Sequence, residues 1–117
     1  MFHRRAELRE AVDASWEVAL PLAGLREGEM VGLCLAGREV LLINLGAEGI
    51  HAYNNRCPHA GSLLSRGHLE AANLHCPSHL WEFDARTGEG LNPQNCWLRR
   101  YPVKVVDGMV LVQARAV

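Results

Sequence analysis

Short apolar runs separated by turn-forming residues make up most of the chain. Glycines recur at short intervals between positions 24 and 108, and the segments between them alternate or run apolar. Strands need only about four to eight residues, whereas helices need more, so this spacing favours strands. We expect strands over residues 16–20, 30–35, 39–44, 50–53, 103–106 and 109–112.

The last two of these runs flank the pair Asp107-Gly108. A two-residue hairpin turn needs positive backbone φ angles, which this pair adopts readily. The sequence therefore predicts a hairpin near the C-terminal end. Taken together, the strands predict a mainly β fold built as stacked antiparallel sheets.

The first 14 residues differ from the rest. Ala6, Leu8, Ala11 and Val12 alternate with Arg and Glu, a pattern that fits either a short helix or a frayed tail. We assign residues 1–14 to an N-terminal extension and residues 15–117 to one domain. A chain of 117 residues is too short for two independent cores.

Composition and charge exclude several classes of partner. The 12 basic and 13 acidic residues are interspersed and give a net charge of −1, which argues against nucleic acid and anionic membranes. The longest apolar stretch, residues 39–45, is far shorter than the roughly 20 residues of a membrane span. The first residues lack the apolar region of a secretory signal. We expect a soluble, cytoplasmic protein.

Four cysteines in such a chain are more typical of metal ligands or free thiols than of disulfides. Two of them begin similar motifs, Cys57-Pro58-His59 and Cys76-Pro77-Ser78-His79. Each motif supplies one thiolate and one imidazole. Together they predict a Cys₂His₂ metal site.

The order of these ligands distinguishes two metals. Zinc sites of this composition usually pair Cys with Cys and His with His, but here each motif mixes the two types. In a Rieske centre one iron is bound by two Cys and the other by two His, so each motif can give one ligand to each iron. The order favours a [2Fe-2S] cluster, and a zinc-stabilised binding module is the alternative.

The two motifs, separated by 16 residues, resemble the ligand signature of the Rieske family. The resemblance covers the chain from about Trp16 onward. It implies a Rieske-type fold of three antiparallel sheets, with a small cluster-binding tip subdomain at about residues 54–97. It also implies one [2Fe-2S] cluster with both His ligands at the exposed tip, held by Cys57, His59, Cys76 and His79.

The run from His79 to Pro93, with Trp81 and Gly90-x-Asn92-Pro93, resembles the ferredoxin component of bacterial multicomponent toluene monooxygenases. This resemblance implies a monomeric one-electron carrier without catalysis of its own. Its partners would be an NADH-dependent flavin reductase and a diiron hydroxylase of an aromatic monooxygenase system. Ferredoxins of ring-hydroxylating dioxygenases and the small subunit of nitrite reductase are the alternatives of the same chemistry.

The residues around the motifs bear on the reduction potential. High-potential Rieske proteins resemble a pattern with two extra cysteines, joined in a disulfide, where this chain has Ser62 and Ser78. Leu80-Trp81 also replaces their Gly-Ser, which removes a hydroxyl donor. Fewer hydrogen bonds to the cluster lower its potential, so we expect the low end of the Rieske range of about −150 to +300 mV.

Several other conspicuous residues have simpler interpretations. Cys34 lies in an apolar run and is expected to be a small buried side chain, and Cys96 a packed thiol. Trp97 is assigned to the core, while the role of Trp81 stays open. His75 should point away from the cluster side if Cys76 points toward it, because neighbours in a strand face opposite ways.

Overall fold

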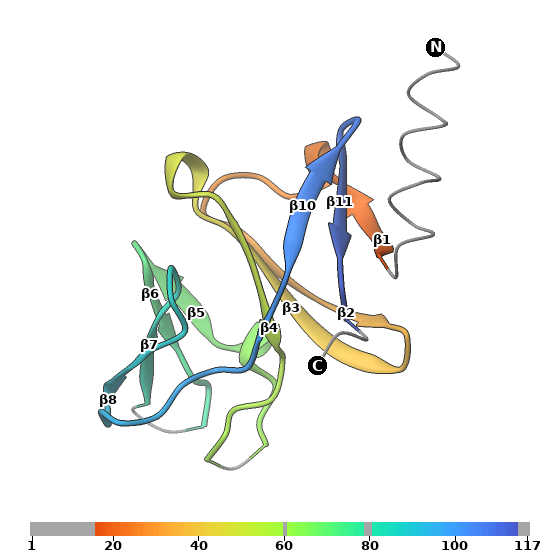
Figure 1. Ribbon diagram of the computed structural model, residues 1–117. Coiled ribbons are helices and arrows are strands. Elements are labelled where there is room, and N and C mark those ends of the chain that lie inside the picture. The colour runs from red at the N-terminus through yellow and green to blue at the C-terminus, as the bar shows by residue number, and fades with distance from the viewer. Residues whose placement is uncertain (1–15, 60, 79–80, 115–117) are drawn as a thin grey trace.

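The described residues form three antiparallel sheets (Figure 1). The computed structural model describes residues 16–59, 61–78 and 81–114. A terminal sheet has the strand order β1 (Glu17–Pro21), β11 (Met109–Val112) and β10 (Val103–Val106). A central sheet has the order β2 (Met30–Leu35), β3 (Arg38–Asn44), β4 (Ile50–Asn54) and β9 (Arg100–Tyr101). A distal sheet has the order β5 (His68–Glu70), β6 (Asn73–His75), β7 (Glu82–Asp84) and β8 (Gly90–Asn92).

Short 3₁₀ helices lie in three of the connections: η1 (Leu22–Gly24), η2 (Gly46–Glu48) and η3 (Leu64–Arg66). Within the described ranges, none of the helices has the length and apolar character needed to cross a bilayer. The predicted mainly β class is confirmed. The proposed helix or tail at residues 1–14 lies outside the described residues.

Strand β3 is buried on both faces, which explains its unbroken apolar run. Val40 and Leu42 belong to a core cluster shared with Val110 and Val112 of the terminal sheet. The alternate residues Leu41 and Ile43 belong to a second cluster, shared with Leu74 and Phe83 of the distal sheet. A strand between two packed layers must be apolar at every position, whereas a strand with one wet face alternates. The central sheet is thus the middle layer of the molecule.

The predicted strands agree with β1, β2, β3, β4, β10 and β11 to within a residue or two at their ends. The hairpin at Asp107-Gly108 is confirmed, with φ angles of 52° and 77°. The strands of the distal sheet were not predicted individually. Each has only three residues, too few for a period-two pattern to be visible.

Two burial predictions were wrong. Cys34 is exposed because β2 is an edge strand of the central sheet, and its odd-numbered positions Val31, Leu33 and Leu35 pack inward instead. Trp97 is 61% exposed, and its neighbour Leu98 occupies the core position.

Candidate metal centre

The two Cys-containing motifs form loops that are closed in the same way. In the Cys57 loop (residues 57–62) the backbone N–H of Cys57 donates to the carbonyl of Ser62 at 2.8 Å. In the Cys76 loop (residues 76–81) the N–H of Cys76 donates to the carbonyl of Trp81 at 3.0 Å. The residues just outside each loop pair in antiparallel bridges, Arg56 with Leu63 and His75 with Glu82. The ends of the two loops are therefore closed by the same pattern of backbone hydrogen bonds.

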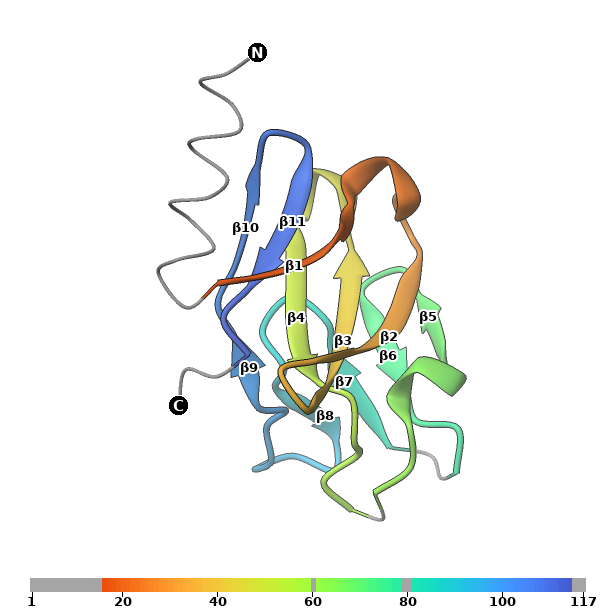
Figure 2. The same cartoon turned by 90° about the vertical axis from the view of Figure 1, so that its right-hand side faces the viewer.

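Contacts between the loops are reciprocal. The third residue of the Cys57 loop, His59, stacks on the sixth residue of the Cys76 loop, Trp81, with ring centroids 4.6 Å apart and planes 28° apart. The sixth residue of the Cys57 loop, Ser62, forms a hydrogen bond between hydroxyl groups with the third residue of the Cys76 loop, Ser78. In both contacts the third residue of one loop meets the sixth residue of the other. Both loops project side by side from the same end of the molecule (Figures 1 and 2).

Burial separates the donor atoms of the site into two layers. Cys57 and Cys76 are only 2% and 6% exposed and belong to the core cluster between the central and distal sheets. His59 is exposed. The structure thus brings Cys57, His59 and Cys76 together, with sulfur toward the core and imidazole toward solvent, while His79 lies outside the described residues. This donor set, with thiol groups toward the core and an imidazole toward solvent, fits a Rieske centre. It is unsuited to Ca²⁺ or Mg²⁺, which prefer oxygen ligands.

Arg56 fixes the base of the Cys57 loop. Its guanidinium forms a two-pronged ion pair with Glu39 of β3, with one N–H donating to Oε1 at 2.9 Å. A further N–H donates to the carbonyl of Gly61, inside the loop, at 2.8 Å. The hydrogen bond from Arg56 holds the pKa of Glu39 below its usual value, so the pair is fully charged at neutral pH. The loop is thereby tied to the middle of the central sheet.

Asn55 is buried next to Arg56 and fixes the segment that follows the loop. Its Oδ1 accepts the N–H of Ser65 at 2.9 Å, and its Nδ2 donates to the Ser65 hydroxyl at 3.0 Å. Sequence reasoning missed both Asn55 and the Glu39–Arg56 pair. Asn55 and Arg56 directly precede Cys57 and could have been suspected, but nothing local connects them with Glu39, 17 residues away from Arg56.

Ser62 and Ser78 meet at the place where the family resemblance predicts a disulfide in other proteins. In this chain a hydrogen bond between the Ser62 and Ser78 hydroxyl groups joins the loops at that place. Cys96 is half-buried, and its thiol donates to the carbonyl of Pro93 at 3.3 Å, in agreement with the predicted packed thiol. Trp81, whose role was open, packs against the core and covers His59.

Other histidines among the described residues lie away from the two loops' donor atoms. His75 stacks on His68 on the outer face of the distal sheet, so it points away from the Cys76 side as predicted. His51 is buried in the central sheet and its Nε2 lies 2.8 Å from the carbonyl of Glu48.

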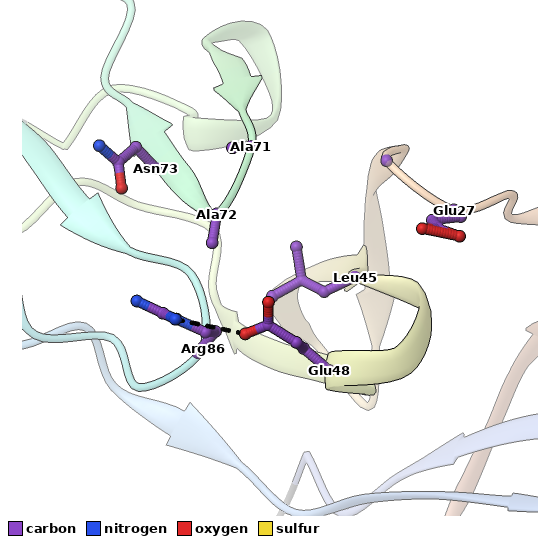
Figure 3. Close-up of a pocket in the computed structure, with 8 residues that line it drawn as sticks. Glu27, Leu45, Glu48, Ala71, Ala72, Asn73 and Arg86 are labelled. Atoms are coloured by element: carbon purple, nitrogen blue, oxygen red, sulfur yellow. Dashed lines mark hydrogen bonds and ion pairs between the residues drawn. The ribbon is translucent and has the colours of Figure 1, made fainter.

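A separate cavity of about 510 Å³ lies at the other end of the distal sheet, between the β5–β6 turn and η2 (Figure 3). The Arg86–Glu48 ion pair, at 3.4 Å, crosses it. Its other lining residues are Glu27, Gly28, Leu45, Ala71, Ala72 and Asn73. The cavity is therefore no part of the loop site.

Comparison with known proteins places these features in context. Residues 15–102 match the family model of the Rieske [2Fe-2S] domain. The chain is 42% identical to the ferredoxin component of the alkene monooxygenase system of Xanthobacter autotrophicus, over 75% of this chain and 72% of that protein. It is 34% identical to the ferredoxin component of the naphthalene 1,2-dioxygenase system of Pseudomonas putida, over 83% and 93% of the two chains. The ferredoxin of carbazole 1,9a-dioxygenase from Nocardioides aromaticivorans IC177 has the same fold, with a TM-score of 0.76, 30% identity and coverage of 83% and 95%.

Proposed function

Because the chain belongs to the Rieske [2Fe-2S] family and is a ferredoxin-type electron carrier, we propose that it transfers electrons from an NADH-dependent flavin reductase to the hydroxylase of an oxygenase system. When bound, its single [2Fe-2S] cluster supplies reversible one-electron redox chemistry. The chain's own residues hold that group and present it to the two partners. The observation that carries this proposal is the pair of reciprocal loops, with buried thiols beneath an exposed imidazole.

The proposed ligands are Cys57 and Cys76 on the inner side and His59 and His79 on the outer side. Burial of both thiols and exposure of His59 support this division. An exposed imidazole gives a partner close access to the redox group, which a shuttle needs, since electron transfer requires contact but not a long-lived complex. We also propose that residues 54–97, approximately, form a cluster-binding subdomain, because they contain both loops and all four proposed ligands.

The proposed acceptor is the diiron hydroxylase of an aromatic monooxygenase. The alkene monooxygenase ferredoxin, at 42% identity, supports the monooxygenase class, and the residues Trp81 and Gly90-x-Asn92-Pro93 resemble the ferredoxin component of toluene monooxygenases. A dioxygenase is the second candidate because the naphthalene dioxygenase ferredoxin is 34% identical. In either system we expect a monomer that works in the cytoplasm, where NADH is available.

The ligand assignment is tested by substitution. His59→Ala and His79→Ala should each abolish the visible spectrum and the EPR signal of the cluster, because each removes one of the four proposed bonds between the protein and the cluster. Cys34→Ser, at an exposed free thiol, and Cys96→Ser are matched controls that should keep both signals. Iron and acid-labile sulfide should be found at two of each per chain. A histidine variant with a full spectrum, or a protein that holds zinc instead of iron, would refute the assignment.

The choice of acceptor is tested by reconstitution. A diiron hydroxylase and a dioxygenase terminal component, each supplied with NADH and its flavin reductase, are assayed with and without this chain. Product formation should depend on the chain only with the diiron hydroxylase. Equal or better support of the dioxygenase would contradict the choice but leave the ligand assignment intact.

A further inference from the structure

The outer face of the distal sheet carries a cluster of metal-ligating side chains that is separate from the two loops. Strand register places His68 opposite His75 and His75 opposite Glu82. Glu70 lies two residues from His68 and so shares its face. The intervening residues Leu69, Leu74 and Phe83 point the other way, into the core. The arrangement therefore follows from strict alternation along three short strands.

Distances within this cluster suit a shared metal ion. The rings of His68 and His75 stack with centroids 4.3 Å apart, so one ring has to turn out of the stack before both in-plane nitrogen lone pairs can reach one ion. His75 Nε2 lies 3.5 Å from Glu70 Oε2, close to the roughly 3.4 Å that separates two ligands on a tetrahedral zinc with bonds of about 2.0–2.1 Å. One ligand atom from each of His68, Glu70 and His75 lies within 4.8 Å of the others. His68 and Glu70 are exposed, so both side chains can change rotamer and bring their donor atoms into bonding positions.

The remaining carboxylate in the cluster supports the same geometry. Glu82 Oε1 lies 3.9 Å from His75 Nδ1, on the side of the ring opposite Glu70. A carboxylate on the far nitrogen of a metal-binding imidazole fixes the ring orientation and the tautomer that leaves the other nitrogen free. His75 is also the most enclosed member, with 21% of its side chain exposed against 74% for Glu70. At 3.9 Å the Glu82 carboxylate lies beyond hydrogen-bond distance of His75 Nδ1, and a small shift on metal binding would bring it onto that nitrogen.

The donor types select the metal. Imidazole suits zinc and similar transition-metal ions, whereas Ca²⁺ and Mg²⁺ prefer all-oxygen sites. An ordinary wet sheet face carries polar side chains that point separately into water, whereas here the donor atoms of two imidazoles and one carboxylate lie within 4.8 Å of one another.

We propose that His68, Glu70 and His75 form a second metal site that binds one Zn²⁺ per chain, with Glu82 positioning His75. The site is distinct from the redox centre, because His75 faces outward while the adjacent Cys76 is buried in the core. Bound zinc links β5 to β6 at the entrance to the Cys76 loop. It thereby stabilises the strands from which that loop emerges.

The test uses the holoprotein, freed of loosely bound ions by a brief chelator wash that leaves its colour unchanged. Zinc chloride is titrated in by calorimetry while the visible spectrum is recorded. We expect one Zn²⁺ per chain with no bleaching. His68→Gln and Glu70→Gln, both at exposed positions, should weaken binding by roughly tenfold or more. Zinc should also raise the temperature at which colour is lost in the wild type but not in these variants.

Glu89→Gln is the matched control. It removes the same charge as Glu70→Gln from an exposed position before β8, outside the cluster, and should bind zinc like the wild type. The proposal is overturned by an absence of binding or by unchanged affinity in the His68 and Glu70 variants. It is equally overturned if zinc binds only as the colour disappears, since the cluster ligands would then be the binding groups.

Discussion

At the scale of single residues, the contact between Trp81 and His59 gives the indole a definite role. The ring is half-buried against the core and covers one face of an otherwise exposed imidazole. It therefore keeps water from one side of the proposed iron ligand. Solvent exposure is one of the factors that set the potential of an iron–sulfur centre.

Replacing Trp81 by Leu should raise the reduction potential. Water that reaches His59 stabilises the reduced state, which carries one more negative charge than the oxidised state. The expected rise is a few tens of millivolts, which is less than the roughly 59 mV that corresponds to a tenfold change for one electron. Protein-film voltammetry measures the reduction potential. Trp97→Leu removes an indole that is 61% exposed and should leave the potential unchanged. A lowered potential for Trp81→Leu would show that shielding is not its effect.

The sequence predicts burial poorly where it depends on distant partners. Cys57, His59, Cys76 and His79 are proposed as ligands from their spacing, which is a local signal and needs no knowledge of packing. Cys34 was misplaced because every residue near it is apolar, so the run does not reveal which face of an edge strand is wet. Trp97 was misplaced because the adjacent Leu98 fills the core site, an outcome fixed by packing rather than by hydrophobicity.

At the scale of elements, the two loops could be predicted but their reciprocal contact could not. Each loop is defined by its own Cys-Pro start, whereas the approach of Ser62 to Ser78 depends on how β4 and β6 are placed in different sheets. The long strands were predicted from their patterns, and β3 was recognised from its unbroken apolar run. The short strands of the distal sheet exist because neighbouring strands pair with them, which no local pattern records.

The contact between the serines predicts that a covalent link can replace it. In the double variant Ser62→Cys with Ser78→Cys, the two sulfur atoms should form a disulfide, because side chains in hydrogen-bond contact place their Cβ atoms within bridging range. Closing a loop of about 15 residues should stabilise the holoprotein by about 3 kcal/mol against urea. Mass spectrometry verifies the link.

The single variant Ser62→Cys serves as the control for this gain, and reduction of the double variant should reverse it. The opposite result is a double variant that keeps two free thiols after mild oxidation while the cluster is still present. That result would mean that the two loops are further apart than the hydrogen bond between Ser62 and Ser78 indicates.

At the scale of the whole molecule, Tyr53 joins the central sheet to the distal sheet. It is fully buried in β4, and its hydroxyl donates to the carbonyl of Ala85, just beyond β7, at 2.7 Å. Burial raises the pKa of Tyr53 to about 12. The phenol therefore stays neutral in the folded protein at pH values where the unfolded chain, with a pKa of about 10, ionises.

This shift predicts a loss of stability in alkali. The contribution of Tyr53 to the free energy of unfolding is fully present below pH 10. It declines as the pH rises from about 10 toward 12, because in that range only the unfolded chain releases the phenol proton. Tyr53→Phe should be less stable than the wild type by about 1 kcal/mol at pH 8. The difference in the free energy of unfolding between variant and wild type should narrow at pH 11. Urea unfolding at both pH values measures this difference. A difference that does not change with pH would disprove the raised pKa of Tyr53.

The two loops originate from different layers, since the Cys57 loop follows a strand of the central sheet and the Cys76 loop connects two strands of the distal sheet. A local separation of the central and distal sheets would therefore part the proposed ligands without requiring the β10–β11 hairpin or the pairing of β2, β3 and β4 to open. Such an opening would give iron a route into the proposed site. The cell's assembly machinery would meet a nearly complete scaffold, not an unstructured polypeptide, each time the protein has to be loaded or repaired.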